Sequence, residues 1–169
     1  MKNTKKFLAA VMALAMVSAL APMSAFAVDD AVINQDSDPK TGTMNVTYSV
    51  APTYTVTIPA SVTLGNDSTI SVKDVNLATG KKILVKLTGA ANTVTGTNFT
   101  VKTADATPAM ATYQVKKGDT ALAVGGTAYE FTYNGTTKTD SGTLSFTEPT
   151  DARFAGTYTD QLTFTISVE

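Results

Sequence analysis

Only carboxylates, hydroxyls and lysines are available for chemistry in this 169-residue sequence, because it contains neither histidine nor cysteine. Zinc and copper sites are commonly built from histidine and cysteine ligands, and the Ser-His and Cys-His nucleophile systems need a histidine base. The composition therefore argues against most hydrolases and against the commonest metal centres. We expect a protein that is not an enzyme, has no catalytic residues and carries no cofactor.

Paired carboxylates remain available for glycoside hydrolysis, for example Glu130 or Glu148 with an aspartate. Glu130, however, has the opposite parity to Tyr129 and Phe131, so it is predicted to face solvent on a strand. Glu148 precedes Pro149 and is predicted to lie in a loop. Both carboxylates are therefore interpreted as solvated charges.

A second candidate site is the spacing Asn34-x-Asp36-x-Asp38, which resembles the first half of a calcium-binding loop. Pro39 stands where such a loop needs glycine, and Asn45 stands where it needs a bidentate glutamate. We therefore expect no metal site, and an acidic lead-in segment instead.

The N-terminus has the three parts of a secretory signal peptide. Three lysines precede an uncharged run from Phe7 to Met23, and Ala25-Phe26-Ala27 follows just before Val28. A retained membrane anchor is the alternative, since an apolar run of this length is near the lower limit for crossing a bilayer. Pro22 favours cleavage because it breaks the helix just before the small residues. We predict a signal-peptide helix within residues 1–27, removal after Ala27, and a secreted or cell-surface protein with no membrane segment after cleavage.

The charge of the mature part argues against a nucleic-acid partner. Three of the 13 basic residues and none of the 14 acidic residues lie in the first 27 positions, so the mature part carries a net charge of −4. A nucleic-acid site needs a basic face that neutralises phosphates.

Alternation of apolar residues with threonine and other polar residues predicts β-strands, because successive side chains of a strand point to opposite faces. The clearest segments are 43–50, with Met44, Val46, Tyr48 and Val50 on one face, 54–58, and the final segment 158–168. Further strands are predicted at 70–77, 82–87, 98–103, 111–116, 128–133 and 142–147.

Two local features are also predicted, a bulge within one strand and a tight turn between two strands. The apolar parity changes from Ile70 and Val72 to Val75, which indicates a β-bulge near Lys73-Asp74. Asn134-Gly135 is the best signal for a hairpin, because a type I′ turn needs positive φ at both positions.

About nine strands and no helical pattern after residue 27 predict an antiparallel, immunoglobulin-like β-sandwich over residues 42–169, with a closed barrel as the alternative. Residues 28–41 have no strong pattern and are predicted to be a flexible lead-in.

The C-terminal half also resembles a known class of protein. Tyr113-Gln114-Val115, Gly142-Thr143-Leu144-Ser145-Phe146 and the segment Ala155–Val168, with Gly-Thr-Tyr-Thr-Asp at its start, resemble bacterial fimbrial and spore-coat-U-type modules. The resemblance implies the immunoglobulin-like fold and a role on the cell surface. Unlike many such modules, this chain has no cysteine and no tryptophan.

Two functions remain open from the sequence. The first is a fimbrial-type structural or adhesive surface module that associates with itself, with other surface proteins or with a host ligand, and in which residues 28–41 add as a strand to a neighbour. The alternative is a carbohydrate-binding module that serves a secreted enzyme system and binds a polysaccharide. That alternative needs exposed aromatic rings, whereas most of the six tyrosines lie on the apolar side of their predicted strands.

Overall fold

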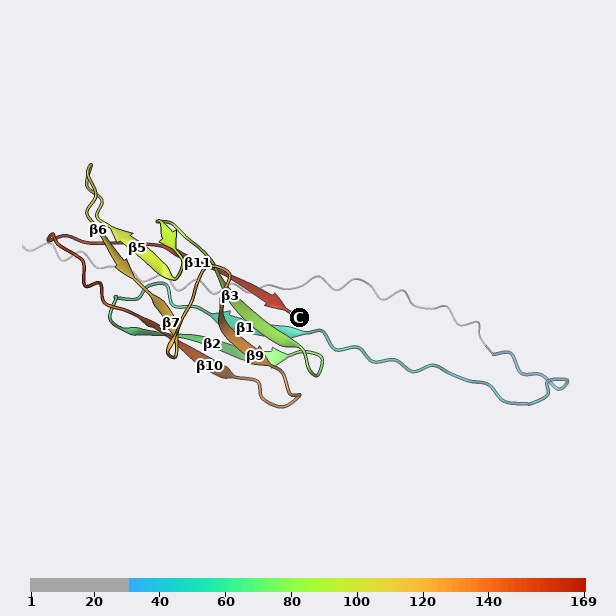
Figure 1. Ribbon diagram of the computed structural model, residues 1–169. Coiled ribbons are helices and arrows are strands. Elements are labelled where there is room, and N and C mark those ends of the chain that lie inside the picture. The colour runs from blue at the N-terminus through green and yellow to red at the C-terminus, as the bar shows by residue number, and fades with distance from the viewer. Residues whose placement is uncertain (1–30) are drawn as a thin grey trace, which may run out of the picture.

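The computed structural model describes residues 31–169, and this part of the chain is all-β, antiparallel and without a helix. The predicted signal-peptide helix lies outside the described residues, as do Ala25, Ala27 and Val28 of the predicted cleavage site. Eleven strands form three sheets, and residues 31–52 lie outside them, with a turn around residues 35–36 followed by a stretch that leads back to β1 (Figure 1).

The largest sheet has five strands in the order β1-β2-β10-β7-β8. Its strands are β1 (Thr53–Thr57), β2 (Asp67–Asn76), β10 (Asp140–Phe146), β7 (Val115–Lys117) and β8 (Thr120–Ala121). A second sheet has the order β11-β3-β9, with β11 (Leu162–Val168), β3 (Lys82–Ala90) and β9 (Thr127–Thr132). The third sheet is β4 (Val94–Thr95), β5 (Asn98–Lys102) and β6 (Met110–Tyr113).

One cluster of buried apolar side chains draws on all three sheets. Among its fully buried members are Ile70, Val72, Val75, Ile83, Val85, Leu87, Phe99, Val115 and Leu144. On β3 the residues at every second position, Ile83, Val85 and Leu87, are all 0% exposed. The alternation read from the sequence therefore gives the correct inner face for this strand.

Strands β9 and β10, which belong to different sheets, contact each other. The Tyr129 hydroxyl donates a hydrogen bond of 2.9 Å to Asp140, and the Tyr129 ring lies over Gly142. A Cβ atom at position 142 would meet the ring at 2.5 Å, so only glycine fits there without a shift of the ring.

The predicted bulge in β2 is confirmed. The register between β1 and β2 skips between the pairs Thr53↔Asn76 and Thr55↔Lys73, and Asp74 has a φ of 55°. The Thr53 hydroxyl donates to the carbonyl of Asp74 at 3.1 Å. An extra residue in one strand of a pair produces this shift in parity.

The predicted hairpin at Asn134-Gly135 is wrong. Strand β9 belongs to the β11-β3-β9 sheet and β10 to the five-stranded sheet, so the chain crosses between sheets here. The turn is instead an Asx type, in which the Asn134 side-chain oxygen accepts from the N–H groups of Thr136 and Thr137 at 2.9 and 2.8 Å. Asn-Gly signals a tight turn, but it does not say whether the flanking strands pair with each other.

The strand predicted at 43–50 is also wrong for the single chain. These residues belong to none of the three sheets, and all of them are exposed. The final strand is shorter than predicted, since it begins at Leu162, and Thr159 forms only an isolated bridge to Lys102. The other predicted strands all correspond to strands of the structure, with the segment 111–116 divided between β6 and β7.

Candidate functional site

Two aspartates, Asp140 and Asp160, accept hydrogen bonds from buried tyrosines and thereby stabilise the fold. Asp160 accepts hydrogen bonds from the Tyr113 hydroxyl at 2.9 Å and from the Asn92 N–H at 3.0 Å. Burial, and then the hydrogen bond to Asp160, raise the pKa of Tyr113, and the same causes with Asp140 raise the pKa of Tyr129. Both phenols therefore stay protonated and act as donors. Neither pair has a signal in the sequence, because no local pattern joins residues 47 or 11 positions apart.

Asp151 fixes the long connection between β10 and β11. Its carboxylate accepts from the N–H and from the hydroxyl of Thr112, both at 2.9 Å. These two hydrogen bonds hold the pKa of Asp151 below its ordinary value. The carboxylate is a structural tie between this connection and β6.

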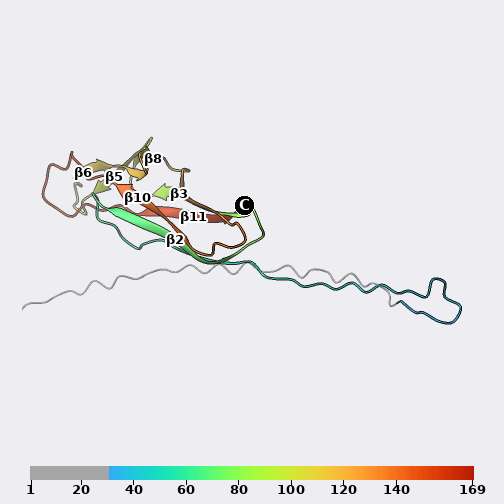
Figure 2. The ribbon, with the colours of Figure 1, turned by 90° about the horizontal axis from the view of Figure 1, so that it is seen from below.

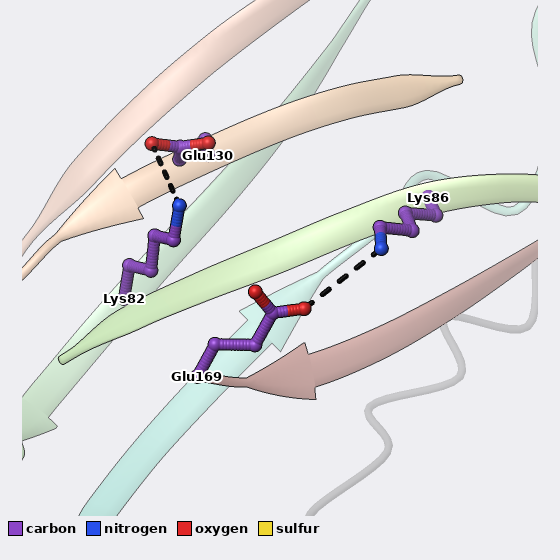
Figure 3. A network of polar contacts seen from close by, with 4 residues as sticks. All are labelled: Lys82, Lys86, Glu130 and Glu169. Atoms are coloured by element: carbon purple, nitrogen blue, oxygen red, sulfur yellow. Dashed lines mark ion pairs between the residues drawn. The ribbon is translucent and has the colours of Figure 1, made fainter. Parts of the chain in front are cut away.

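Both glutamates considered for catalysis are exposed, as predicted. Glu130 is exposed on the outer face of its sheet and lies 3.8 Å from Lys82, while Glu148 is exposed in the connection after β10 and packs against Gly65. Figure 3 shows the Lys82–Glu130 pair beside a second pair, Lys86–Glu169, which is also 3.8 Å long. Exposed pairs of this kind contribute little to stability.

The segment around Asn34 forms a turn. The Asn34 side-chain oxygen accepts from the N–H of Asp36 at 2.9 Å, and the Lys40 ammonium donates to the carbonyls of Asn34 and Gln35. Within residues 31–169 no three potential ligands among histidine, cysteine, aspartate and glutamate gather into a metal-binding group. The same part of the chain has no helix long and apolar enough to cross a bilayer.

The aromatic side chains are mostly in the core. Tyr113, Tyr129 and Tyr133 are buried, Tyr54 and Tyr158 are partly buried, and Tyr48 is 92% exposed. The prediction that most tyrosines serve as packing residues is confirmed, because the three buried ones belong to the core cluster and Tyr54 and Tyr158 pack against it.

An open hollow of about 570 Å³ lies between the β5–β6 turn, residues 103–109, and Phe154 in the β10–β11 connection. Its lining is mostly small or apolar, and Phe154 is 71% exposed. No cluster of convergent polar groups accompanies it, so its shape does not define a ligand.

The most unusual surface of the molecule is the arm, defined here as Met44–Val50. Its four apolar side chains, Met44, Val46, Tyr48 and Val50, are 86%, 87%, 92% and 59% exposed. They recur at every second position, which is the pattern of a strand with one face buried. In Figures 1 and 2 the arm leaves the sheets at the end of the molecule where the C-terminus lies.

Strand β11 is the second unusual surface. Its residues Phe164, Ile166 and Val168 stand opposite Leu87, Val85 and Ile83 of β3, which places them on the core side of the sheet. Yet Phe164 and Ile166 are only partly buried and Val168 is 39% exposed, whereas the three partners on β3 are 0% exposed. The cause is position, because β11 is an edge strand with β3 on one side and no strand on the other.

Comparison with known proteins adds no assignment: no protein-family model, no curated protein and no solved structure matches this chain. The geometry of the arm and of the β11 edge is therefore the basis for proposing a function.

Proposed function

We propose that this protein is an exported, non-enzymatic structural or adhesive module of the cell surface. In this proposal the five-stranded sheet and the β11-β3-β9 sheet form an immunoglobulin-like sandwich, and the protein assembles by adding a strand to a neighbour. The observation that carries the proposal is the exposed arm. Four large apolar side chains, between 59% and 92% exposed, stand in strand alternation beside a folded core. Contiguous exposed apolar surface of this kind marks an interaction site, and alternation fits strand addition better than any other mode.

The strand that is added differs from the segment 28–41 that the sequence predicts for this role. The alternation lies in Met44–Val50, and the turn around Asn34 interrupts the preceding segment. A strand needs an uninterrupted row of side chains that alternate in direction. We therefore place the added strand after residue 42.

The alternative, a carbohydrate-binding module, has less support. Tyr48 is the only tyrosine in the exposed class in the part of the chain that the structure describes. Binding to a polysaccharide surface usually needs several exposed rings in one plane, and the other five tyrosines are wholly or partly buried.

Light scattering and electron microscopy of the protein that begins at Val28 test the proposal. We expect concentration-dependent multimers that persist when residues 28–41 are deleted and disappear when residues 28–50 are deleted. Because no side chain of the arm is buried in the single chain, the longer deletion should leave the circular dichroism spectrum and the melting temperature of the core unchanged. A strictly monomeric protein at high concentration would contradict the proposal.

A further inference from the structure

The free edge of β11 has backbone groups available for pairing. Lys82 and Glu169 exchange both backbone hydrogen bonds, each 3.0 Å long, at the end of the β3–β11 pair. In an antiparallel ladder such pairs alternate with pairs that make no bond to each other. The N–H and C=O groups of Val168, Ile166 and Phe164 therefore point away from β3, toward the open side.

Nothing in the sequence of β11 protects this edge. Edge strands are usually blocked by a charged side chain, by proline or by a pronounced bulge in mid-strand. The segment Leu162–Val168 contains no charge and no proline, and its one register irregularity lies at its beginning, between Thr163 and Phe164. The edge is thus open to another strand over most of its length.

The arm complements this edge in length, pattern and polarity. Met44–Val50 and Leu162–Val168 both have seven residues, with apolar side chains at the first, third, fifth and seventh positions. The positions between them carry only uncharged polar residues: Asn45, Thr47 and Ser49 in the arm, and Thr163, Thr165 and Ser167 in β11. Paired side by side, the two strands would continue one apolar row over the core and one polar row on the outer face.

The position of the arm favours a second copy of the chain as the acceptor. Only Ala51 and Pro52 separate the arm from β1, which begins at Thr53. A residue before proline prefers an extended backbone, which favours an arm that continues outward from β1. Figures 1 and 2 show this course in two views.

We propose that Met44–Val50 of one molecule pairs as an additional strand with the free edge of β11 in a second molecule, where its apolar side chains cover Phe164, Ile166 and Val168. This proposal rests on the self-assembly proposed above and names the acceptor. The contact joins two different surfaces, so repeated addition gives a filament or a ring.

Cysteine cross-linking tests this pairing directly, because the natural chain has no cysteine. Thr47 is the central residue of the arm and Thr165 the central residue of Leu162–Val168, so the two lie opposite each other in either strand direction when the ends are aligned. Both side chains are exposed in the single molecule. Residues directly opposite in a sheet have the Cα separation that a disulfide needs.

The experiment mixes T47C protein with T165C protein, each beginning at Val28, under mild oxidation. The matched control mixes T47C with T132C, since Thr132 is exposed on β9, the other edge strand of the same sheet. Strands held side by side give an effective concentration on the order of millimolar, so at micromolar protein we expect at least about tenfold more disulfide in the first mixture than in the control. Mass spectrometry of the linked peptides measures both.

A second pair of variants tests the face of the arm. Val46→Asp places a charge on the side that would face the core, and Asn45→Asp places the same charge on the outer side. We expect the first to lower the cross-link yield at least about tenfold and the second to change it less than about twofold, because burial of an unpaired charge is costly. Equal effects would overturn the proposed face.

Three further outcomes separate this proposal from the self-assembly on which it rests. If the unsubstituted protein forms multimers but the mixture of T47C and T165C gives no disulfide, the assignment of β11 as the acceptor is overturned and self-assembly stands. A monomer at every concentration would overturn both. An intramolecular disulfide in the T47C/T165C double variant, without linked dimers, would show that the arm pairs with its own domain and would also overturn the proposal.

Discussion

The arm Met44–Val50 and strand β11 have the same length and the same alternation, but they lie in opposite environments. In the arm the four apolar side chains are between 59% and 92% exposed, whereas in β11 Phe164 and Ile166 are partly buried against the core. The two sequences differ little in strand propensity, since both are rich in β-branched and aromatic residues. The difference arises because β11 has β3 beside it and the arm has no neighbouring strand.

This comparison shows that alternation specifies which side chains share a face but does not supply a partner. Strand β11 itself has a neighbour on one side only. The side chains of Ile83, Val85 and Leu87 on β3 are fully buried, whereas the core-side residues of β11 remain partly exposed. The arm has an exposed apolar row without a neighbouring strand, and β11 has an edge without a second neighbour, so each could cover the other. The stability of the single molecule should therefore depend strongly on β3 and not at all on the arm.

The largest expected effect comes from truncation of the partner of β11. Leu87 is 0% exposed and stands opposite Phe164, so Leu87→Ala should lower the free energy of unfolding by about 2–5 kcal/mol through the cavity it leaves. Met44→Ala is the matched control on the 86% exposed side chain of the arm, and it should change the monomer by less than about 0.5 kcal/mol. Urea denaturation at low protein concentration measures both. A comparable loss in the two variants would mean that the arm is packed in the single molecule.

A smaller effect is expected at the contact between β9 and β10. Gly142→Ala forces a Cβ atom to within 2.5 Å of the buried Tyr129 ring, whose hydroxyl is held by Asp140. The ring cannot move without loss of that bond, so we expect a loss of about 1–3 kcal/mol in the free energy of unfolding, measured by urea denaturation. Gly89→Ala is the matched control, because Gly89 also lies in a strand but a Cβ atom there meets Thr163 only at 3.8 Å, an ordinary contact distance. Equal losses would show that the ring does not restrict position 142.

Alkaline pH should weaken the two tyrosine–aspartate pairs, one of which fixes the residues just before β11. The pKa of Tyr113 and of Tyr129 is raised in the folded state above the ordinary value of 10.0, so the unfolded chain releases these protons first as the pH rises. Their contribution to stability is therefore complete below pH 10 and is lost progressively as the pH rises from 10 toward the raised pKa of the folded state. Tyr129→Phe should cost about 1 kcal/mol at pH 8. The Tyr113→Phe/Tyr129→Phe double variant should show a smaller fall in the urea midpoint between pH 8 and pH 11 than the natural protein, and an equal fall would refute the assignment.

The smallest effect is expected at the outer face of the same sheet. The pair Lys86–Glu169 lies at the C-terminal end of β11, with side chains 42% and 51% exposed (Figure 3). Lys86→Ala should change the free energy of unfolding by less than about 0.5 kcal/mol, because water already screens the pair. Thermal melts at low and high salt check this, and a loss above about 1 kcal/mol that disappears in salt would show that the pair matters more than its exposure suggests.

Much of the fold follows from short-range pattern. Alternation predicts the inner faces of β1, β3 and β9, and the change of parity in β2 predicts the bulge at Asp74. Glu130 is correctly predicted to face solvent for the same reason. These features depend on the direction of neighbouring side chains, which the two-residue period of a strand determines.

The pairing of strands and the tyrosine–aspartate contacts could not be predicted in this way. Asn134-Gly135 signals a turn wherever it stands, and only the whole fold decides that β9 and β10 belong to different sheets. Asp160 and Tyr113 are 47 residues apart, and no local pattern links them. Long-range contacts of this kind depend on how the sheets pack.

By itself, the sequence determined that this protein is built from strands, that its available chemistry is limited to carboxylates, hydroxyls and lysines, and which side chains of each segment share a face. Only the tertiary structure decided which alternating segments find a partner. A strand needs the hydrogen-bonding groups of a second strand. Within one molecule, β3 supplies them along one edge of β11, and no strand supplies them to the arm.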